Sequence, residues 1–346
     1  MADYETVPLA VDEIGVAAAQ MNPVLVDAAN PVVGKRENLQ RLLYLCDQAQ
    51  VMANMYSGKA NLVVFPEFSI TGYDFSWQTK DFLDVALDLE GEEIQAIGEK
   101  AKALDIYVAF ASHIKDADWP GHYFNCSLLV GPSGKLIHRH WKAHGIGPSF
   151  EFATSVHEVM DEFIERYGAD AIWPVARTPI GNIATYTCSE GFQPETARAF
   201  AFKGAEILCR CIGGGGYLNK SGKYQLLFRA DCAASNLYGV YSNSGSGVAF
   251  QGVSAPDNGF GGGSMIVDFF GRVLNEAHDS RETIVFEKIP IASHRKDRER
   301  PSLRSELFTK GYETTPGKYP ANLYSDYGIP EDAMAAIQLA AKHARD

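Results

Sequence analysis

Short runs of β-branched and aliphatic residues recur along the chain and alternate with segments of helical periodicity. The runs are IGVAAAQM, NLVVFPE, DIYVAFASH, CSLLVG, KLIHRHWK, NIATYTC, EILCRCI, YGVYSN, SMIVDFF and TIVFEKI. Gly, Pro or Asn bounds most of them, which is typical of β-strands. Between several runs, residues 36–55 and 92–104 place apolar side chains at helical spacing. Strands that alternate with helices predict an α/β fold.

The domain organisation follows from where this pattern stops. No internal repeat or low-complexity tract marks a linker before about residue 290, so residues 1–289 are predicted to form one large domain. Residues 290–346 are charged, then rich in Pro, Gly and Tyr, and end in a predicted helix. Disordered segments contain few aromatic residues, so we expect an arm at an oligomer interface in preference to a disordered tail.

Composition excludes several classes of partner. The 346 residues are 46% hydrophobic, enough for a core without disulfides or metals. A net charge of -12 without clustered Lys and Arg argues against nucleic acid and anionic lipid. The chain start lacks the pattern of a signal peptide, and no apolar run approaches the roughly 18 residues of a membrane span. Six cysteines without C-x-x-C pairs suggest free thiols, so we expect a cytoplasmic protein.

Glycine-rich and histidine-rich segments do not fit common cofactor or metal sites. GGGGYLNKSGK has the wrong spacing for a P-loop, and neither it nor GFGGGS fits G-x-G-x-x-G. These glycines are interpreted as letting the backbone pass close to a cavity. His138, His140 and His144 lack carboxylates at matching spacing, which favours a half-buried strand edge over a metal site. No cofactor is therefore predicted.

Three side chains that can carry chemistry stand at the ends of predicted strands. Glu67 follows NLVVFP, Lys142 ends KLIHRHWK, and Cys188 ends NIATYTC, shortly before a helix that Pro194 opens. Strand-end charges are usually solvated, and a lone cysteine is usually a core residue. The helix start near Cys188 favours a second interpretation, in which backbone N–H groups and the helix dipole lower the pKa of a reactive thiol.

The segments around these three residues resemble a known family. FPEFSITGYD, HRHWK and TCSEGFQPETARAFAFKGAEILCRC resemble, in order and spacing, the signature segments of the nitrilase superfamily, the carbon–nitrogen hydrolases. AAAQMNP, FRADCAASNLYGVYSNSG and GGSMIVDFFGRVLNEA are similar to further segments, so the resemblance covers about residues 13–289. RSELFTKGYETTPGKYPANLY resembles the tails of the amidase-like branch. The resemblance implies a four-layer α-β-β-α sandwich with a C-terminal arm, commonly assembled as a homodimer or as an assembly of dimers.

Carried over residue by residue, the resemblance implies a reaction. Cys188 is the nucleophile, Glu67 the general base, and Lys142, with the backbone N–H of Ser189, faces the tetrahedral intermediate. The implied activity is hydrolysis of a small, non-peptide linear amide through an acyl-thioester, with neither metal nor organic cofactor. Hydrolysis of a nitrile or of an N-carbamoyl compound stays open. The non-enzymatic alternative, an inactive binding relative, is disfavoured because all three residues are present.

The family also carries a second glutamate shortly after the lysine, and two residues compete for this role. Ser155 and Glu158 fit the S-x-x-E capping box at the start of an amphipathic helix, which explains Glu158 without catalysis. Glu151 follows a Gly-Pro loop and has no such structural explanation. The supporting role is therefore assigned to Glu151.

The substrate pocket is expected around the same motifs. Its predicted lining, with aromatic walls and small residues, consists of Phe68, Tyr73, Phe150, Ser189, Glu190, Phe192 and Gly213. Glu190 stands where most relatives carry aspartate, so it is expected to alter the pocket rim. These residues do not distinguish aliphatic amides, aryl amides, carbamoyl compounds or acylated amines.

Overall fold

Two β-sheets pack face to face in the computed structural model, which describes residues 4–145, 152–245, 261–302 and 304–345. The first sheet runs β13 (Thr283–Ile289), β1 (Ile14–Gln20), β2 (Ala60–Val64), β4 (Tyr107–Lys115), β5 (Phe124–Val130), β6 (Leu136–Trp141), with β3 (Leu87–Asp88) beside β4. The second runs β12 (Val273–Glu276), β11 (Met265–Val267), β10 (Tyr238–Asn243), β9 (Ile207–Ile212), β8 (Gly181–Thr187), β7 (Ala176–Thr178).

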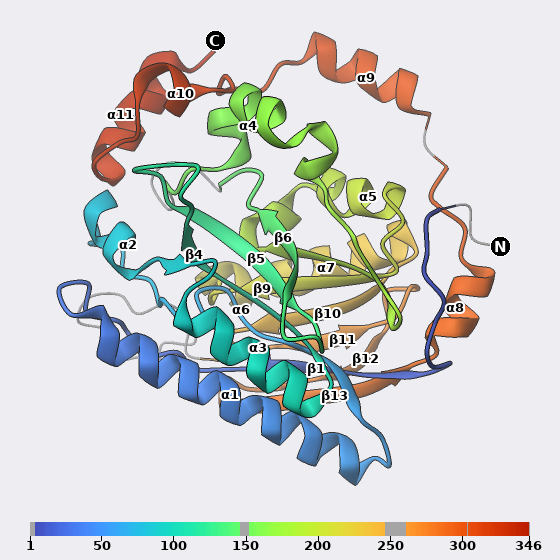
Figure 1. Ribbon diagram of the computed structural model, residues 1–346. Helices are drawn as coiled ribbons and strands as arrows, with labels where there is room; N and C mark the ends of the chain where they lie inside the picture. The colour runs from blue at the N-terminus through green and yellow to red at the C-terminus, as the bar shows by residue number, and fades with distance from the viewer. Residues whose placement is uncertain (1–3, 146–151, 246–260, 303, 346) are drawn as a thin grey trace.

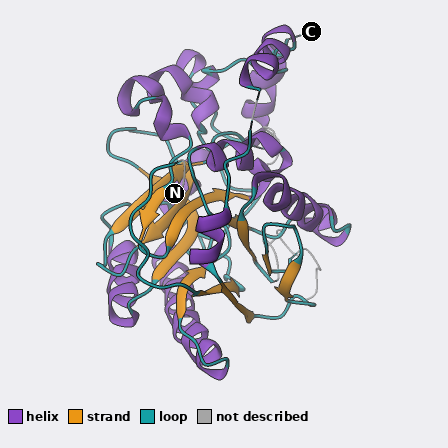
Figure 2. Cartoon of the chain, turned by 90° about the vertical axis from the view of Figure 1, so that its right-hand side faces the viewer, coloured by secondary structure: helices purple, strands orange, loops and turns teal. Residues whose placement is uncertain are grey.

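Helices cover the outer faces of both sheets (Figures 1 and 2). The first half of the chain contains α1 (Pro31–Met55), α2 (Thr79–Val85), α3 (Glu92–Leu104), the 3-10 helix η1 (Val156–Val159), α4 (Met160–Tyr167) and the 3-10 helix η2 (Ala169–Ile172). The 3-10 helix η3 (Cys188–Phe192), α5 (Pro194–Phe202), α6 (Gly216–Lys220) and α7 (Lys223–Ser235) follow. The C-terminal helices are α8 (Ile291–Asp297), α9 (Ser305–Thr314), α10 (Leu323–Tyr327) and α11 (Ala333–His343).

Three apolar clusters define four layers. Leu42 of α1 and Ile94 of α3 pack with Val63 on the outer face of the first sheet. The inner faces of the two sheets bury a second set of side chains, including Val16, Leu62, Ile183 and Cys209. Phe200 of α5 and Phe228 of α7 pack with Leu208 of the second sheet. The predicted α-β-β-α sandwich is therefore confirmed.

Strand direction brings the candidate residues to one edge. β1, β2 and β4 are parallel, and β6 runs in the same direction as β4 because both are antiparallel to β5. In the second sheet, β8, β9 and β10 are parallel. Glu67 follows β2, Lys142 follows β6, Cys188 follows β8 and Gly213 follows β9. Such carboxyl ends are where α/β folds gather their ligand sites.

The segment after β13 packs mostly against its own chain. Arg295 of α8 donates to the buried Glu206, from Nε to Oε1 and from Nη2 to Oε2, at 2.7 Å in each case. The Tyr324 hydroxyl of α10 donates to the Phe152 carbonyl at 3.2 Å. Only the middle of the segment differs, because α9 buries none of its residues and lies apart from the sheets (Figure 1). The division into residues 1–289 and an arm of residues 290–346 stays a prediction.

Candidate active site

Glu67 lies at the centre of the candidate site and is almost fully buried. Its Oε1 accepts hydrogen bonds from Lys142 Nζ at 3.0 Å and from Asn125 Nδ2 at 2.6 Å. Its Oε2 accepts from the Gly213 N–H at 3.1 Å. The backbone carbonyl of Asn125 also accepts from the Lys142 N–H at 2.9 Å, so one residue of β5 holds both partners of the ion pair. A buried carboxylate needs this number of donors to offset its lost hydration.

Cys188 is the first residue of η3 and lies at the sharp turn that follows β8. Its φ of 41° lies in the left-handed region, which is uncommon for a residue with a side chain and is typical of functional turns. The turn is held from behind by Arg210 of β9, whose Nε and Nη2 donate to the Cys188 carbonyl at 3.1 and 2.6 Å. Glu67 and Lys142 both act electrostatically on the thiol.

The expected lowering of the Cys188 pKa is wrong. Burial and the negative charge of Glu67 raise the pKa of the thiol to about 12, although Lys142 and a hydrogen bond to Tyr224 act in the opposite direction. Desolvation disfavours the charged form of a thiol more strongly than these groups favour it. The resting nucleophile is therefore a neutral thiol that needs a base to remove its proton.

Glu190 lies behind the nucleophile turn and not at the pocket rim where we expected it. Its side chain is fully buried. Oε2 accepts from the Thr187 N–H at 2.8 Å, while Oε1 bonds to the Ala143 N–H and to His140 Nε2, both at 2.9 Å. Burial alone would raise the pKa of this carboxyl, but His140 and these donors outweigh it and lower the pKa to about 2. Glu190 thus ties the turn of Cys188 to the residue after Lys142.

Aromatic side chains border the same strand ends. Phe68 stacks on His113 and Tyr73, with ring centroids 4.6 and 5.0 Å apart. A Cβ on Gly213 would lie 2.8 Å from the Phe68 ring, so glycine at this position permits the close approach of the ring. Phe192 packs on Tyr224 at 5.0 Å. The Ser189 side chain is buried, and its Oγ has no hydrogen-bond partner among the described residues.

Of the two candidates for the second glutamate, only Glu158 is among the described residues. Glu151 and the predicted pocket residue Phe150 lie outside the described residues. Glu158 lies on η1, where its carboxylate accepts a hydrogen bond from the Ser155 hydroxyl. Its Oε1 also lies 3.8 Å from His157 Nδ1. Glu158 is therefore not brought to Glu67, Lys142 or Cys188, and the assignment of Glu151 stays a prediction.

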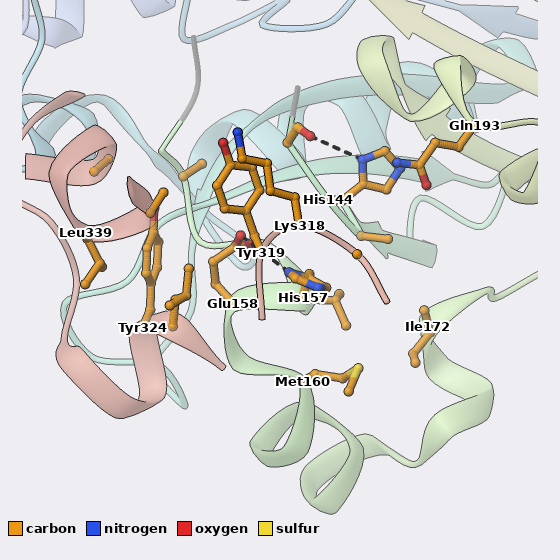
Figure 3. A pocket seen from close by; sticks show the side chains of 18 of the residues that line it. His144, His157, Glu158, Met160, Ile172, Gln193, Lys318, Tyr319, Tyr324 and Leu339 are labelled. Atoms are coloured by element: carbon orange, nitrogen blue, oxygen red, sulfur yellow. Dashed lines mark hydrogen bonds and ion pairs between the residues drawn. The ribbon is translucent and has the colours of Figure 1, made fainter. Parts of the chain in front are cut away.

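Glu158 instead lines a cavity of about 560 Å³ between the body and the C-terminal segment (Figure 3). His144 and Gln193 border one side, and Lys318, Tyr319 and Tyr324 border the other. Glu67, Lys142 and Cys188 are not among the residues that line this cavity.

The structure also tests the cysteines and histidines. All six cysteines are described and free, and only Cys188 is not fully buried. His138 bonds to Thr185 of β8 in the facing sheet at 3.0 Å, and His140 bonds to Glu190 of η3 at 2.9 Å. Within the described residues, no group of three or more His, Cys, Asp and Glu side chains could hold a metal ion. Likewise, no described helix combines the length and the apolar character needed to cross a membrane.

Sequence reasoning missed three residues of the site: Asn125, Arg210 and Tyr224. Asn125 and Tyr224 belong to no segment that we assigned to chemistry, whereas Arg210 lies inside the signature segment TCSEGFQPETARAFAFKGAEILCRC. A buried arginine in an apolar strand is rarely left without a partner, and this was the one available signal.

Comparisons with known proteins agree with this geometry. The sequence model of the family described as carbon–nitrogen hydrolase matches residues 15–299. Formamidases of Bacillus cereus and Bacillus anthracis are 26% identical over 312 residues, which cover 87% of this chain and 84% of theirs.

Solved structures show the same fold. An amidase of the nitrilase superfamily from Nesterenkonia AN1 aligns with a TM-score of 0.64 at 18% identity, over 89% of this chain and 100% of that chain. Nit3 of Saccharomyces cerevisiae, also of the nitrilase superfamily, aligns with a TM-score of 0.63 at 18% identity, over 90% and 97% of the two chains. With the family model spanning most of its length and Glu67, Lys142 and Cys188 at one edge of the sandwich, the chain belongs to the carbon–nitrogen hydrolase family.

Proposed function

We propose that this carbon–nitrogen hydrolase cleaves a small linear amide to a carboxylic acid and ammonia or an amine, with Cys188 as nucleophile. The observation that carries the proposal is the buried pair of Glu67 and Lys142 beside the strained turn of Cys188. A carboxylate that can accept a proton and an ammonium that can face an oxyanion are the two groups that a neutral thiol needs in order to attack an amide.

In the first half of the reaction, Glu67 takes the thiol proton as the sulfur of Cys188 attacks the amide carbon. The carbonyl electron pair moves to oxygen, which Lys142 and the backbone N–H of Ser189 stabilise. Glu67 then returns the proton to the departing nitrogen, the C–N bond breaks, and an acyl-thioester remains on Cys188.

In the second half, water replaces the amine. Glu67 removes a proton from water, the resulting hydroxide attacks the thioester carbon, and Lys142 again faces the oxyanion. The C–S bond breaks, the sulfur regains a proton from Glu67, and the carboxylic acid leaves. The same carboxylate acts as base and acid in each half. Glu151 is assigned the supporting role of the second glutamate.

Two comparisons support a small aliphatic amide as the substrate class. The curated relatives at 26% identity are formamidases. The Nesterenkonia amidase has been solved with acrylamide and with the acetamide moiety of fluoroacetamide bound covalently to its active-site cysteine. Phe68 and Tyr73 of the predicted pocket lining stack on each other with ring centroids 5.0 Å apart.

A substrate panel with an ammonia assay tests the proposal. It contains formamide, acetamide, acrylamide and benzamide, the matching nitriles, and N-carbamoylglycine. Turnover of one or more amides by the wild type, and none by Cys188→Ala, is the expected result. Cys46→Ala is the control, because Cys46 is buried in α1 away from the site, and this variant should keep activity. Turnover confined to nitriles or to the carbamoyl compound would replace the amidase proposal with one of the two alternatives.

Assembly and location complete the proposal. Leu307, Phe308 and Tyr312 of α9 are 72%, 50% and 55% exposed, a large apolar area for a single helix. We propose that a second copy of this chain packs against these side chains of α9, so that the protein is a homodimer or an assembly of dimers. The expected cytoplasmic location stays a prediction from the sequence.

A further inference from the structure

The hydroxyl of Tyr224 lies 3.5 Å from the sulfur of Cys188. Within the described residues, it is the only hydrogen-bond partner of that sulfur. Tyr224 is the second residue of α7 and is 2% exposed. It is 36 residues away from Cys188 in the chain and belongs to none of the segments that indicated Glu67, Lys142 and Cys188.

The Tyr224 ring is held in place on several sides. A Cβ on Gly215 would lie 3.0 Å from Cε2 of this ring, so glycine at that position makes room for it. Gly215 has a φ of 91°, which side chains disfavour for a second reason. Phe192 packs on the ring with a centroid distance of 5.0 Å. The hydroxyl therefore reaches the sulfur from a ring with little freedom to turn away.

Arg210 connects the backbones of the two residues. Its guanidinium donates twice to the Cys188 carbonyl, and its Nη1 donates to the Tyr224 carbonyl at 3.4 Å. The guanidinium carbon lies 5.0 Å from the Tyr224 ring centroid. Because the guanidinium is planar and rigid, one buried side chain sets the spacing between the nucleophile turn and the start of α7.

The electrostatic surroundings of the Cys188 thiol show how the Tyr224 hydroxyl can act on it. Charged or polar groups reach the thiol from four elements: Glu67 after β2, Lys142 after β6, Arg210 of β9 and Tyr224 of α7. The neighbouring Tyr241 of β10 also interacts with the thiol. Burial and Glu67 favour the neutral thiol, whereas Lys142, Tyr224 and Arg210 favour the thiolate. Burial raises the pKa of Tyr224 itself far above its ordinary value, so its hydroxyl stays a neutral donor.

We propose that Tyr224 is a further catalytic residue, whose hydroxyl donates a hydrogen bond to the Cys188 sulfur whenever that sulfur carries negative charge. During acylation the S–H proton passes to Glu67, the C–S bond forms, and Tyr224 keeps its own proton. During deacylation the C–S bond breaks, and the same hydrogen bond stabilises the departing sulfur until Glu67 reprotonates it. The inference rests on the proposed role of Cys188 as nucleophile.

Tyr224→Phe tests this role, with Tyr241→Phe as the matched control. Both tyrosines are buried beside Arg210, but the Tyr241 hydroxyl is 3.4 Å from Asn219 Oδ1 and has no hydrogen bond to the sulfur. Both substitutions keep the aromatic ring. The hydrogen bond from Arg210 to residue 224 also remains, because its acceptor is the backbone carbonyl. Thermal unfolding of the three proteins, followed by circular dichroism, checks that each is folded.

Two readouts separate the role of Tyr224 from the amidase proposal. With an amide that the wild type turns over, kcat of Tyr224→Phe should fall about 10- to 100-fold with little change in KM, the effect of one hydrogen bond to a charged group. The rate of alkylation by iodoacetamide against pH needs no amide turnover. In Tyr224→Phe this profile should shift to higher pH by about one unit, while Tyr241→Phe follows the wild type.

An alkylation profile for Tyr224→Phe that matches the wild type would overturn the proposal, whatever the amide panel shows. Equal shifts in both variants would also overturn it, because they would indicate a general effect of the tyrosines around Arg210. If no amide is turned over but the alkylation profile shifts only in Tyr224→Phe, the amidase proposal fails while the contact between Tyr224 and the sulfur stands.

Discussion

Lys142 Nζ lies 3.0 Å from Glu67 Oε1, and both side chains are 2% exposed. Removing two charges from water is costly, and a buried ion pair often stabilises a fold no better than apolar residues of similar size. Here Asn125 and Gly213 complete the hydrogen bonds of the carboxylate. The pair is better explained by chemistry than by stability, since it keeps a base and a cation close to the thiol in a buried site.

A double-mutant cycle on this pair is the first prediction. Lys142→Met and Glu67→Gln should each lower the free energy of unfolding by about 3 kcal/mol or more, because each leaves its partner charge buried and unpaired. The double variant should recover most of this loss, yet all three variants should lose at least about 100-fold in kcat. Urea unfolding and amide turnover provide the measurements. Additive losses of stability in the double variant would show that the two side chains are not coupled.

The reactivity of Cys188 provides the second prediction. With the pKa of its thiol raised to about 12, Cys188 should react slowly with iodoacetamide at pH 7, and the rate should still rise above pH 9. Glu67→Gln removes the charge that opposes the thiolate and frees Lys142 to favour it. This variant should therefore be alkylated faster than the wild type while it loses turnover. Mass spectrometry of the labelled site measures the rate, and slower labelling of Glu67→Gln would contradict the electrostatic argument.

The dependence of stability on pH gives the third prediction, through Glu190. The pKa of its carboxyl is lowered from 4.5 to about 2 in the folded chain. A lowered folded-state pKa contributes stability that is present above the unfolded value and is lost as pH falls from about 4.5 toward 2. Between pH 6 and pH 3 the wild type should therefore lose about 2 kcal/mol more than Glu190→Gln, which cannot titrate at this position.

Urea unfolding of both proteins at the two pH values measures the difference. Other carboxyl groups contribute equally to the two proteins, so the comparison isolates Glu190. Parallel losses in the two proteins would mean that Glu190 titrates in the folded state much as it does in the unfolded chain.

The fourth prediction concerns assembly. Replacing Leu307 and Phe308 of α9 with serine should lower the oligomer mass without unfolding the subunit, because α9 buries no residue in its own chain. Lys310→Ser together with Glu313→Ser is the control on the same helix, and it should leave the mass unchanged. Light scattering gives the mass. Truncation after Ile289 would be a poorer test, since it also removes the buried Tyr324. An unchanged mass in the Leu307 and Phe308 variant would refute α9 as the contact.

Much of the fold could be predicted because its signals are local. The apolar spacing of residues 92–104 matches α3 at both ends, and the run YGVYSN is β10. Periodicity depends only on neighbours in the chain, so it survives without knowledge of packing. The helix predicted over residues 36–55 begins five residues earlier, at Pro31, because proline is favoured in the first turn. The short strands β3 and β7 were not predicted, because two or three residues are too few to show an alternation of apolar and polar side chains.

Within the site, the sequence by itself singled out Glu67, Lys142 and Cys188 as candidates, because each follows or ends a predicted strand inside a recognisable segment. It also carried a signal that was overlooked: Thr187 and Glu190 fit the T-x-x-E capping box, which the structure forms. Only the tertiary structure decided that Asn125 and Gly213 would hold Glu67, and that Arg210 and Tyr224 would hold Cys188. Those contacts join residues from different strands and helices, and they depend on strand order, on register and on how two sheets face each other. A shift of one residue in register would turn Asn125 of β5 and Arg210 of β9 to the opposite face of their sheets, and no local pattern records that choice.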